Sequence, residues 1–341
     1  MKDFNGKIAF ITGGASGAGF GQAQIFSEAG MKVVIADVRQ DHLDEAMAYF
    51  KEKGTPVHAI KLDVTDRAAY AAAADEVEKV FGAAPDLLVL TAGVNVFGPA
   101  EASTYDDFDW VVGVCFGGVV NGLVTFVPRM IKAAKGGYIA ATVSWGAFGA
   151  GSSTAPYSAA KAAVLNLMES YHIALKPYGI GVSAVCPANI RSKIYEAAIQ
   201  GRPEQYSNTG YNVTEDTQKL LASIHANGMD PRVLADWLKK GIENEQFLIV
   251  PYPSGPRMVA LALERFVDYA SPEGMKRLEE NRKQPPTEEA KRHNAEREGY
   301  DVSATRAPGS APSGPAAPFK DVGFGKARKD LDWVDPAKKV N

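Results

Sequence analysis

The chain has 341 residues, enough for one large α/β core with additions. Its 37 Lys and Arg against 40 Asp and Glu give a net charge of −3, which argues against a nucleic-acid-binding surface. Cys115 and Cys186 lie far apart with no His or Cys at ligand spacing, so we expect neither disulfide nor metal site. No secretory leader is visible at the start, and a reduced cytoplasmic setting is expected.

The first predicted elements are a strand over 7–12, a glycine-rich turn and a helix over 20–29. The turn contains Gly13, Gly17 and Gly19 between Thr12 and the helix, with Ser16 among them. This order aims free backbone N–H groups and a helix dipole at a pyrophosphate. A tight connection without a ligand is the alternative interpretation.

A second strand over 32–37 ends in Asp37, eighteen residues after the last glycine of the turn. A carboxylate there accepts hydrogen bonds from an adenosine ribose, although Asp37 could also cap the next helix. A carboxylate repels a 2′-phosphate, so NAD is favoured over NADP. Arg39 nearby keeps NADP open.

Strands and helices continue to alternate, with a helix to about 53, a strand over 57–63, a helix over 66–81 and a strand over 87–92. Such alternation predicts a doubly wound parallel sheet with helices on both faces. Asp63 and Val64 end one strand and are candidates for an adenine contact, unless Asp63 caps a helix. Ala92 and Gly93 end the next, where glycine would let the backbone approach a cofactor.

The stretch 110–128 carries no charge over nineteen residues, and Gly113 and Gly117 have the spacing of packed membrane helices. It also contains Asn121 and falls where the alternation requires a crossover helix. We therefore expect a buried helix packed on the sheet or on a partner subunit, and no membrane span.

Ser144 closes a predicted strand over 138–143, and Tyr157 and Lys161 follow thirteen and seventeen residues later on a predicted helix. Residues four apart share one helical face, so the lysine charge is expected to lower the pKa of the tyrosine and make it a proton donor and acceptor. Ser144 would offer its hydroxyl to the substrate oxygen. Tyr49 and Lys53 repeat the Tyr-x-x-x-Lys pattern without this context and are expected to be a surface pair.

The remaining pattern predicts a strand over 180–186 followed by Pro187 and Ile190, an irregular substrate lid over about 190–230, a helix over 231–243 and a strand over 246–250. We expect one domain over 1–283. Residues 284–341 are charged and then rich in Pro, Gly and Ala, so they are expected to form an extended C-terminal tail in which Phe319, Phe324 and Trp333 are candidate anchors.

In this order, the motifs resemble those of the short-chain dehydrogenase/reductase family over about residues 5–252. The matching residues are Thr12-Gly13-x-x-x-Gly17-x-Gly19, Asp37, Asp63-Val64, Thr91-Ala92-Gly93, Ser144, Tyr157-x-x-x-Lys161 and Pro187-Ala188. The resemblance implies a Rossmann fold, a nicotinamide cofactor and exchange of a hydride between a secondary alcohol and a ketone. It makes Tyr157 the acid/base, Lys161 the group that lowers its pKa and holds the nicotinamide ribose, and Ser144 the residue that orients the substrate oxygen.

Two positions depart from the family pattern. Cys115 stands where the family commonly has an asparagine of a proton relay, and a thiol is a weak hydrogen-bonding group. Asn121 is no substitute, since six residues turn a helix to another face. Ala188 replaces a common glycine. A non-catalytic dinucleotide-binding sensor is therefore the competing hypothesis, and a sugar-nucleotide epimerase a third.

Several stretches look most like bacterial Cα-dehydrogenases, which oxidise the benzylic alcohol of lignin-derived β-aryl ethers; a steroid, a polyol or another secondary alcohol is the alternative substrate. The expected substrate wall is aromatic and consists of Phe97, Trp145, Phe148, Tyr195, Tyr206 and Tyr211. Each could instead pack the lid or the core. The resemblance also implies a homodimer or homotetramer built on the helix over 105–134 and the helix that begins near Tyr157.

Overall fold

The computed structural model describes residues 1–211, 214–282, 284–288 and 291. Within them, seven parallel strands form one sheet in the order β3-β2-β1-β4-β5-β6-β7. Their bounds are β1 Ile8–Thr12, β2 Lys32–Asp37, β3 Val57–Lys61, β4 Leu87–Leu90, β5 Gly137–Thr142, β6 Ile180–Val185 and β7 Leu248–Ile249. The predicted doubly wound parallel sheet is confirmed.

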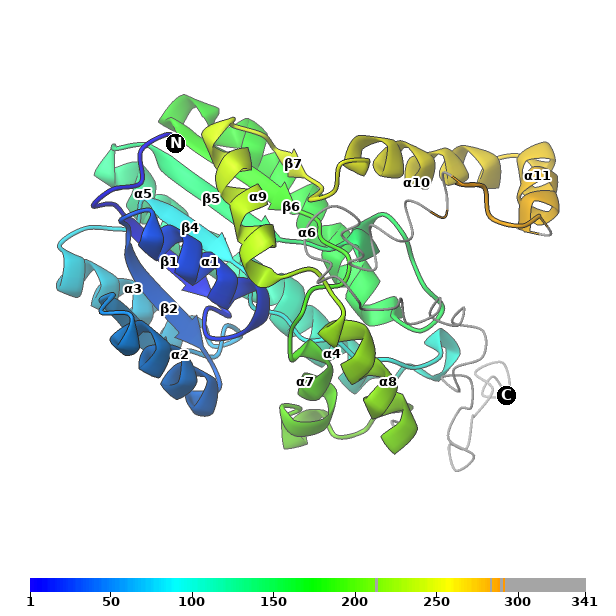
Figure 1. Cartoon of the computed structure of the whole chain (residues 1–341), viewed down its shortest axis with the longest axis horizontal. Coiled ribbons are helices and arrows are strands. Elements are labelled where there is room, and N and C mark those ends of the chain that lie inside the picture. Colours follow the sequence, from blue (N-terminus) through cyan, green and yellow to red (C-terminus); the bar gives the residue numbers. More distant parts are fainter. Residues whose placement is uncertain (212–213, 283, 289–290, 292–341) are drawn as a thin grey trace, which may run out of the picture.

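Helices cover both faces of this sheet (Figure 1). One face is covered by α1 Gly17–Glu28, α2 Gln40–Glu52 and α9 Pro231–Glu243, and the other by α3 Arg67–Phe81, α5 Gly118–Ala133 and α6 Ala155–Ala174. Neighbouring strand residues point to opposite faces. Phe10 therefore packs in the same core cluster as residues of α3 and α5, and Ile11 in the cluster of α1 and α2.

The expected long helix over 105–134 is continuous but not uniform. It consists of α4 Tyr105–Val112, a π-helical turn Gly113–Gly117 and α5. By length and hydropathy alone Tyr105–Ala133 could cross a membrane, a property that core helices share, and half of its most apolar window is buried. Its α5 part packs against α3 and β4, as the prediction of a buried helix requires.

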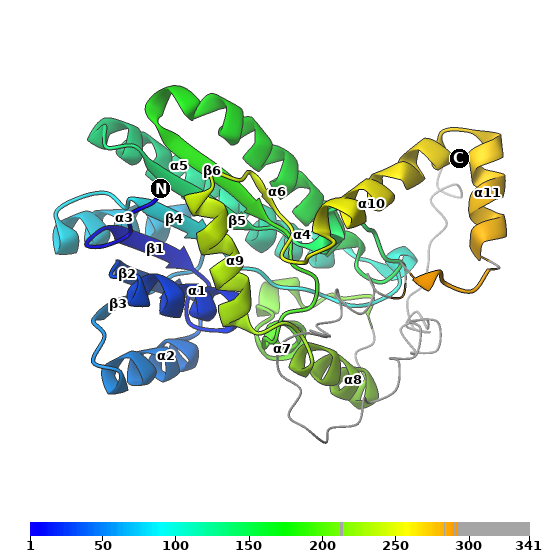
Figure 2. The same cartoon turned by 45° about the horizontal axis from the view of Figure 1, so that its top comes forward.

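The region after β6 differs in detail from the expectation. The lid segment contains α7 Ile194–Gln200 and a full helix, α8 Glu215–Ala226, and the last strand is only two residues long. Beyond it, α10 Gly255–Tyr269 and α11 Pro272–Arg282 form an arm that projects from the sheet (Figures 1 and 2). Apart from 284–288 and 291, the expected tail lies outside the described residues, and so do Phe319, Phe324 and Trp333.

Candidate active site

A cavity of about 1110 Å³ lies at the carboxyl ends of the strands. Residues of the loops that follow each of β1 to β6 line it, together with residues of the lid. The strand order reverses at β1, which pairs with β2 on one side and β4 on the other. Ligands of open parallel sheets bind at such a reversal, and this cavity exceeds the roughly 300–1,000 Å³ typical of small-ligand pockets. It has room for a dinucleotide and a substrate together.

The glycine turn forms a tight cradle at the start of α1. Gly13 has φ +63°, and a Cβ atom there would lie 2.9 Å from the Cα of Ala92. A Cβ on Gly19 would lie 2.0 Å from the carbonyl oxygen of Gly13. Gly17 and Ser16 line the cavity, and the Ser16 side chain does not cap α1. The N–H groups of the first turn carry no side-chain cap and are therefore available to an anion.

Thr12, which begins the glycine motif, does not line the cavity. Its side chain is buried, and Oγ1 accepts hydrogen bonds from the backbone N–H groups of Thr91, at 3.0 Å, and Ala92, at 3.2 Å. Thr12 joins the ends of β1 and β4 and so positions the cradle. Ala92 and Gly93 do line the cavity.

Asp37 lies in the cavity at the end of β2, and burial raises the pKa of its carboxyl, while the N–H of Arg39, donating at 3.1 Å, lowers it. The alternative that Asp37 caps α2 is not observed, because Arg39 occupies the cap position. The Arg39 guanidinium is paired with Asp41 and lies 3.7 Å from Glu196. His42, which the sequence analysis did not single out, is buried and lines the same end of the cavity.

Asp63 and Val64 also line the cavity, beyond the end of β3. Asp63 accepts from the N–H and the hydroxyl of Thr65, at 2.9 and 2.7 Å, and so shapes a turn. The cap of α3 is Asp66 instead. Asn121 donates from Nδ2 to the carbonyl oxygen of Val64 at 2.9 Å. Asn121 therefore holds this loop, a role that only the folded contact reveals.

Ser144, Tyr157 and Lys161 meet at the other end of the cavity. Lys161 is buried, donates from Nζ to the carbonyl oxygen of Thr142 at 2.8 Å, and lies 5.5 Å from the centre of the Tyr157 ring. Ser144 hydrogen-bonds to Tyr157 and accepts from the N–H of Gly146 at 3.0 Å.

The predicted lowering of the Tyr157 pKa is wrong for these surroundings. Desolvation raises the pKa of Tyr157 more than the Lys161 charge and the Ser144 hydrogen bond lower it, and Cys115 and Cys186 add to the rise. The phenol is therefore protonated at neutral pH. It can donate a proton directly, whereas accepting one requires the help of Lys161.

Cys115 lies in the π-helical turn and is fully buried. Its Sγ donates to the carbonyl oxygen of Val94 at 3.1 Å and accepts from the N–H of Val94 at 3.4 Å. Burial raises the pKa of the thiol, so it stays protonated at neutral pH. The residue fixes the backbone after β4 and does not line the cavity, so it provides no relay group there.

Pro187 and Ile190 line the cavity after β6. The carbonyl oxygen of Pro187 accepts from the N–H of Trp145 at 2.7 Å, which joins the loops after β5 and β6. Ile190 forms a parallel bridge with Met229, and His225 Nδ1 lies 3.4 Å from the Ile190 carbonyl oxygen. Contacts from beyond residue 224 thus hold the start of the lid against the sheet.

The structure places only part of the expected aromatic wall at the cavity. Phe97 and Trp145 line the cavity, together with Trp110, which the sequence analysis missed. Four of the expected residues lie outside its lining: Phe148, Tyr195, Tyr206 and Tyr211. They pack the core and the lid, as the alternative interpretation allowed: Phe148 is buried in the main core, and Tyr195 stacks on His225.

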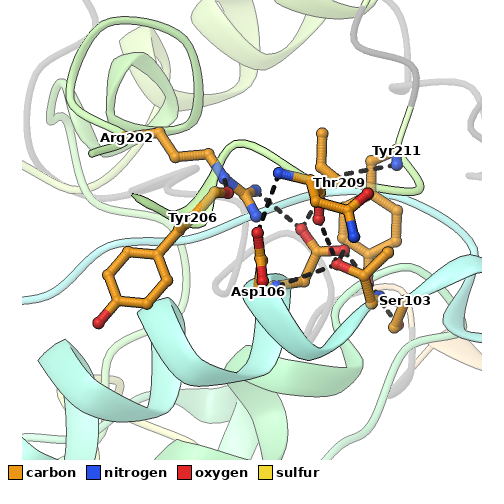
Figure 3. A network of polar contacts seen from close by, with 9 residues as sticks. Ser103, Asp106, Arg202, Tyr206, Thr209 and Tyr211 are labelled. Carbon is orange, nitrogen blue, oxygen red and sulfur yellow. Dashed lines mark hydrogen bonds and ion pairs between the residues drawn. The ribbon is translucent and has the colours of Figure 1, made fainter. Parts of the chain in front are cut away.

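A polar network joins the lid to the start of α4 (Figure 3). Asp107 is fully buried, caps α4 together with Thr104, and accepts from Arg202 at 2.8 Å and from the Thr209 hydroxyl at 2.8 Å. The Arg202 guanidinium lies 5.2 Å from the centre of the Trp110 ring. The Tyr211 hydroxyl is 2.5 Å from that of Ser103. The network therefore fixes both the lid and one aromatic wall of the cavity.

A family model described as short chain dehydrogenase matches residues 7–202. The chain belongs to the short-chain dehydrogenase family. A curated member, the C alpha-dehydrogenase of Sphingobium sp. (strain NBRC 103272 / SYK-6), is 52% identical over 272 residues, or 80% of this chain and 89% of that protein. The present short-chain dehydrogenase is therefore an oxidoreductase that uses a nicotinamide cofactor and a small-molecule substrate.

Solved structures of short-chain dehydrogenases show the same fold. The apo form of LigD from Sphingobium sp. strain SYK-6 is 46% identical, with 79% of this chain and 100% of that chain covered and a TM-score of 0.66. A short chain dehydrogenase/reductase from Burkholderia phymatum in complex with NAD is 30% identical, with 78% and 96% covered and a TM-score of 0.72.

The residues of this short-chain dehydrogenase fit a nicotinamide dinucleotide. A side chain at Gly19 would fill the cradle, and the Asp37 carboxylate lines the cavity at the end of β2 beside Arg39, whose guanidinium is paired with Asp41. At the opposite end, the Lys161 ammonium and the Tyr157 phenol line the same cavity, and Lys161 is held by the carbonyl oxygen of Thr142.

Proposed function

We propose that the chain oxidises the benzylic Cα alcohol of an aromatic β-aryl ether to the ketone with NAD. The observation that carries this proposal is the 52% identity to a C alpha-dehydrogenase over most of both chains. The cavity supports it, because Phe97, Trp110 and Trp145 give its lining three aromatic faces. Such a lining suits a substrate with two aromatic rings better than a polyol.

The roles proposed for the reacting groups follow from their contacts. Bound NAD supplies the hydride acceptor. Tyr157 takes the proton of the carbinol, for which its own phenol must first be deprotonated. The nearby Lys161 charge stabilises this Tyr157 phenolate. Ser144 donates to the substrate oxygen while the Gly146 N–H holds its hydroxyl in place.

NAD rather than NADP is proposed because of the charges at the adenosine end. Asp37 would repel a 2′-phosphate, and the guanidinium of Arg39 is already paired with Asp41 and lies near Glu196. A titration of protein fluorescence with NADH and NADPH tests this. We expect at least tenfold tighter binding of NADH, and equal or tighter binding of NADPH would contradict the proposal.

Tyr157→Phe tests the reaction. We expect NADH formation from a β-aryl ether alcohol to fall by roughly 10²- to 10⁴-fold, the range typical of a lost acid/base, with NADH binding retained. Tyr49→Phe is the matched control, because Tyr49 and Lys53 are also four residues apart but do not line the main cavity. Lys53 Nζ lies 5.8 Å from the centre of the Tyr49 ring. A simple benzylic alcohol, a hydroxysteroid and a sugar alcohol complete the panel. Preferred turnover of any of these would overturn the aryl ether assignment.

We also propose a cytoplasmic homodimer or homotetramer. Both cysteines are free and buried, which suits a reducing compartment. Exposed apolar side chains remain on the two helices named for the interface, Val124 on α5 and Ile173 on α6.

A further inference from the structure

The lid reaches the adenosine end of the cavity through α7. Ile194 and Ala197 of this helix line the cavity, whereas Glu196 between them does not. The Glu196 carboxylate instead lies beside α2, with Oε2 at 3.7 Å from Nη1 of Arg39. Arg39 occupies the cap position of α2 and lines the cavity. An ion pair therefore joins the lid to the nucleotide half of the molecule at the edge of the cavity.

The guanidinium of Arg39 has a carboxylate at each of its three nitrogens. Nε donates to Oδ1 of Asp41 at 3.0 Å and Nη2 donates to Oδ2 of the same residue, while Nη1 faces Glu196. The hydrogen bond to Asp41, and then the charges of Asp41, Glu196 and Asp37, raise the pKa of Arg39. One cation is thus surrounded by three carboxylates.

Arg39 is placed where an arginine can select the cofactor. The extra 2′-phosphate of NADP carries about −1.5 to −2 charges at pH 7, and an arginine near the end of the second strand can accommodate it. Among the described residues, the Lys and Arg side chains that line the cavity are Arg39, Lys161 and Lys193. Lys161 lies at the opposite end, and Lys193 lies 3.4 Å from Glu45. Arg39, two residues after Asp37, is therefore the cation nearest to the expected 2′ position.

The two carboxylates that hold the Arg39 guanidinium differ in origin. Asp41 belongs to the start of α2 and its side chain is 57% exposed, whereas Glu196 comes from the lid and its side chain is 21% exposed. The charge of Glu196 is therefore less screened by solvent. Nη1 of Arg39 can turn to a phosphate only by leaving Glu196.

We propose that Glu196 is a positioning residue for cofactor selection: it acts through Arg39, keeps the guanidinium from a 2′-phosphate, and so gives the lid a part in the choice of NAD over NADP. The inference rests on the proposed function, because it explains a preference for NAD. The lid that covers the substrate end of the cavity then also carries a residue that decides which dinucleotide binds at the other end.

Glu196→Gln tests this, because it keeps the size of the side chain and removes its charge. Titrations of protein fluorescence with NADH and NADPH at low salt give both dissociation constants. We expect the ratio of the NADPH to the NADH constant to fall about threefold or more, with NADH binding little changed. A merely structural role of Glu196 in the lid would weaken both cofactors alike and leave the ratio unchanged. Glu196→Asp retains the charge and should keep most of the wild-type preference.

An Arg39→Leu background shows whether Glu196 acts through Arg39. With no guanidinium to release, Glu196→Gln should change the ratio by less than about twofold in that background. Glu78→Gln is the matched control, because it removes one of the two carboxylates beside Arg129 on the opposite face of the sheet. It should leave both dissociation constants unchanged.

The outcomes separate this inference from the proposed function. A wild type that binds NADPH as tightly as NADH, or more tightly, would overturn the proposed use of NAD and this inference with it. A wild type that prefers NADH, with the same ratio in Glu196→Gln, would overturn the role of Glu196 alone. Equal changes with and without Arg39 would overturn the action through Arg39. If Glu196→Gln binds neither cofactor, Glu196→Ala decides by the same ratio.

Discussion

Tyr157 illustrates how burial and a neighbouring charge compete at a single residue. The short spacing to Lys161 indicates a lowered pKa, yet desolvation of the phenol outweighs the lysine charge, and the pKa of Tyr157 is raised. Lys161 is itself buried and held by the carbonyl oxygen of Thr142. Its charge therefore limits a rise that would otherwise be larger.

Lys161→Met should move the pH profile of alcohol oxidation to higher pH. Oxidation needs the deprotonated phenol, and removing the charge that lowers the pKa of Tyr157 raises that pKa further. At pH 7 we expect kcat to fall roughly 10²-fold, and to recover partly as the pH rises. Lys161→Arg retains the charge and should shift the profile less. A Lys161→Met profile that coincides with the wild type would contradict this account of Tyr157.

Cys115 shows that a departure from a family pattern need not be a lost function. The thiol pairs both polar groups of the Val94 backbone, and its burial keeps it protonated. Cys115 therefore gives little support to the sensor hypothesis, and Ser144, Tyr157 and Lys161 line one cavity.

At the scale of elements, the lid is attached to the sheet domain through α4. The Asp107 carboxylate accepts hydrogen bonds from Arg202 and Thr209 of the lid, and it also caps its own helix together with Thr104. Arg202 lies over the ring of Trp110, and Trp110 lines the cavity. A change in the attachment of the lid therefore also changes the shape of the cavity.

Asp107→Asn should loosen the lid. The substitution leaves the guanidinium of Arg202, whose side chain is 10% exposed, without its counter-charge, and breaking such a buried pair costs roughly 3–5 kcal/mol. We expect KM for the alcohol to rise about tenfold or more, the dissociation constant of NADH to change little, and proteolysis near 201–211 to quicken. Glu215→Gln, in an exposed pair with Lys219, is the control. A loss of NADH affinity as large as the rise in KM would instead indicate general unfolding.

At the scale of the whole molecule, α5 and α6 each cover the sheet and still carry exposed apolar side chains. Val124 is 63% exposed and Ile173 is 64% exposed. Small residues in the π-helical turn between α4 and α5, including Gly113 and Gly117, permit close approach of another helix.

Light scattering should give two or four times the chain mass of 36.4 kDa at micromolar concentration. Val124→Glu places a charge in the proposed interface and should shift the mass towards that of one chain, because burying an unpaired charge is unfavourable. Val80→Glu, at an exposed apolar position of α3, should leave the mass unchanged. A wild-type monomer would refute the proposed assembly.

The sequence by itself determined the parts of this protein that depend on local pattern. Alternating apolar strands and helices predicted the doubly wound sheet, because burial on both faces requires that periodicity. The glycines around Gly17, the carboxylate of Asp37 and the spacing of Tyr157 and Lys161 predicted which end of each strand would face a ligand.

Only the tertiary structure decided which side chains enter the cavity and what charge they carry. Phe148 and Tyr211 are aromatic, as a substrate wall requires, yet both are buried by packing and neither lines the cavity. Trp110 does line the cavity, although the sequence of its helix shows only that the helix is apolar. The raised pKa of Tyr157 depends on desolvation by residues distant in sequence.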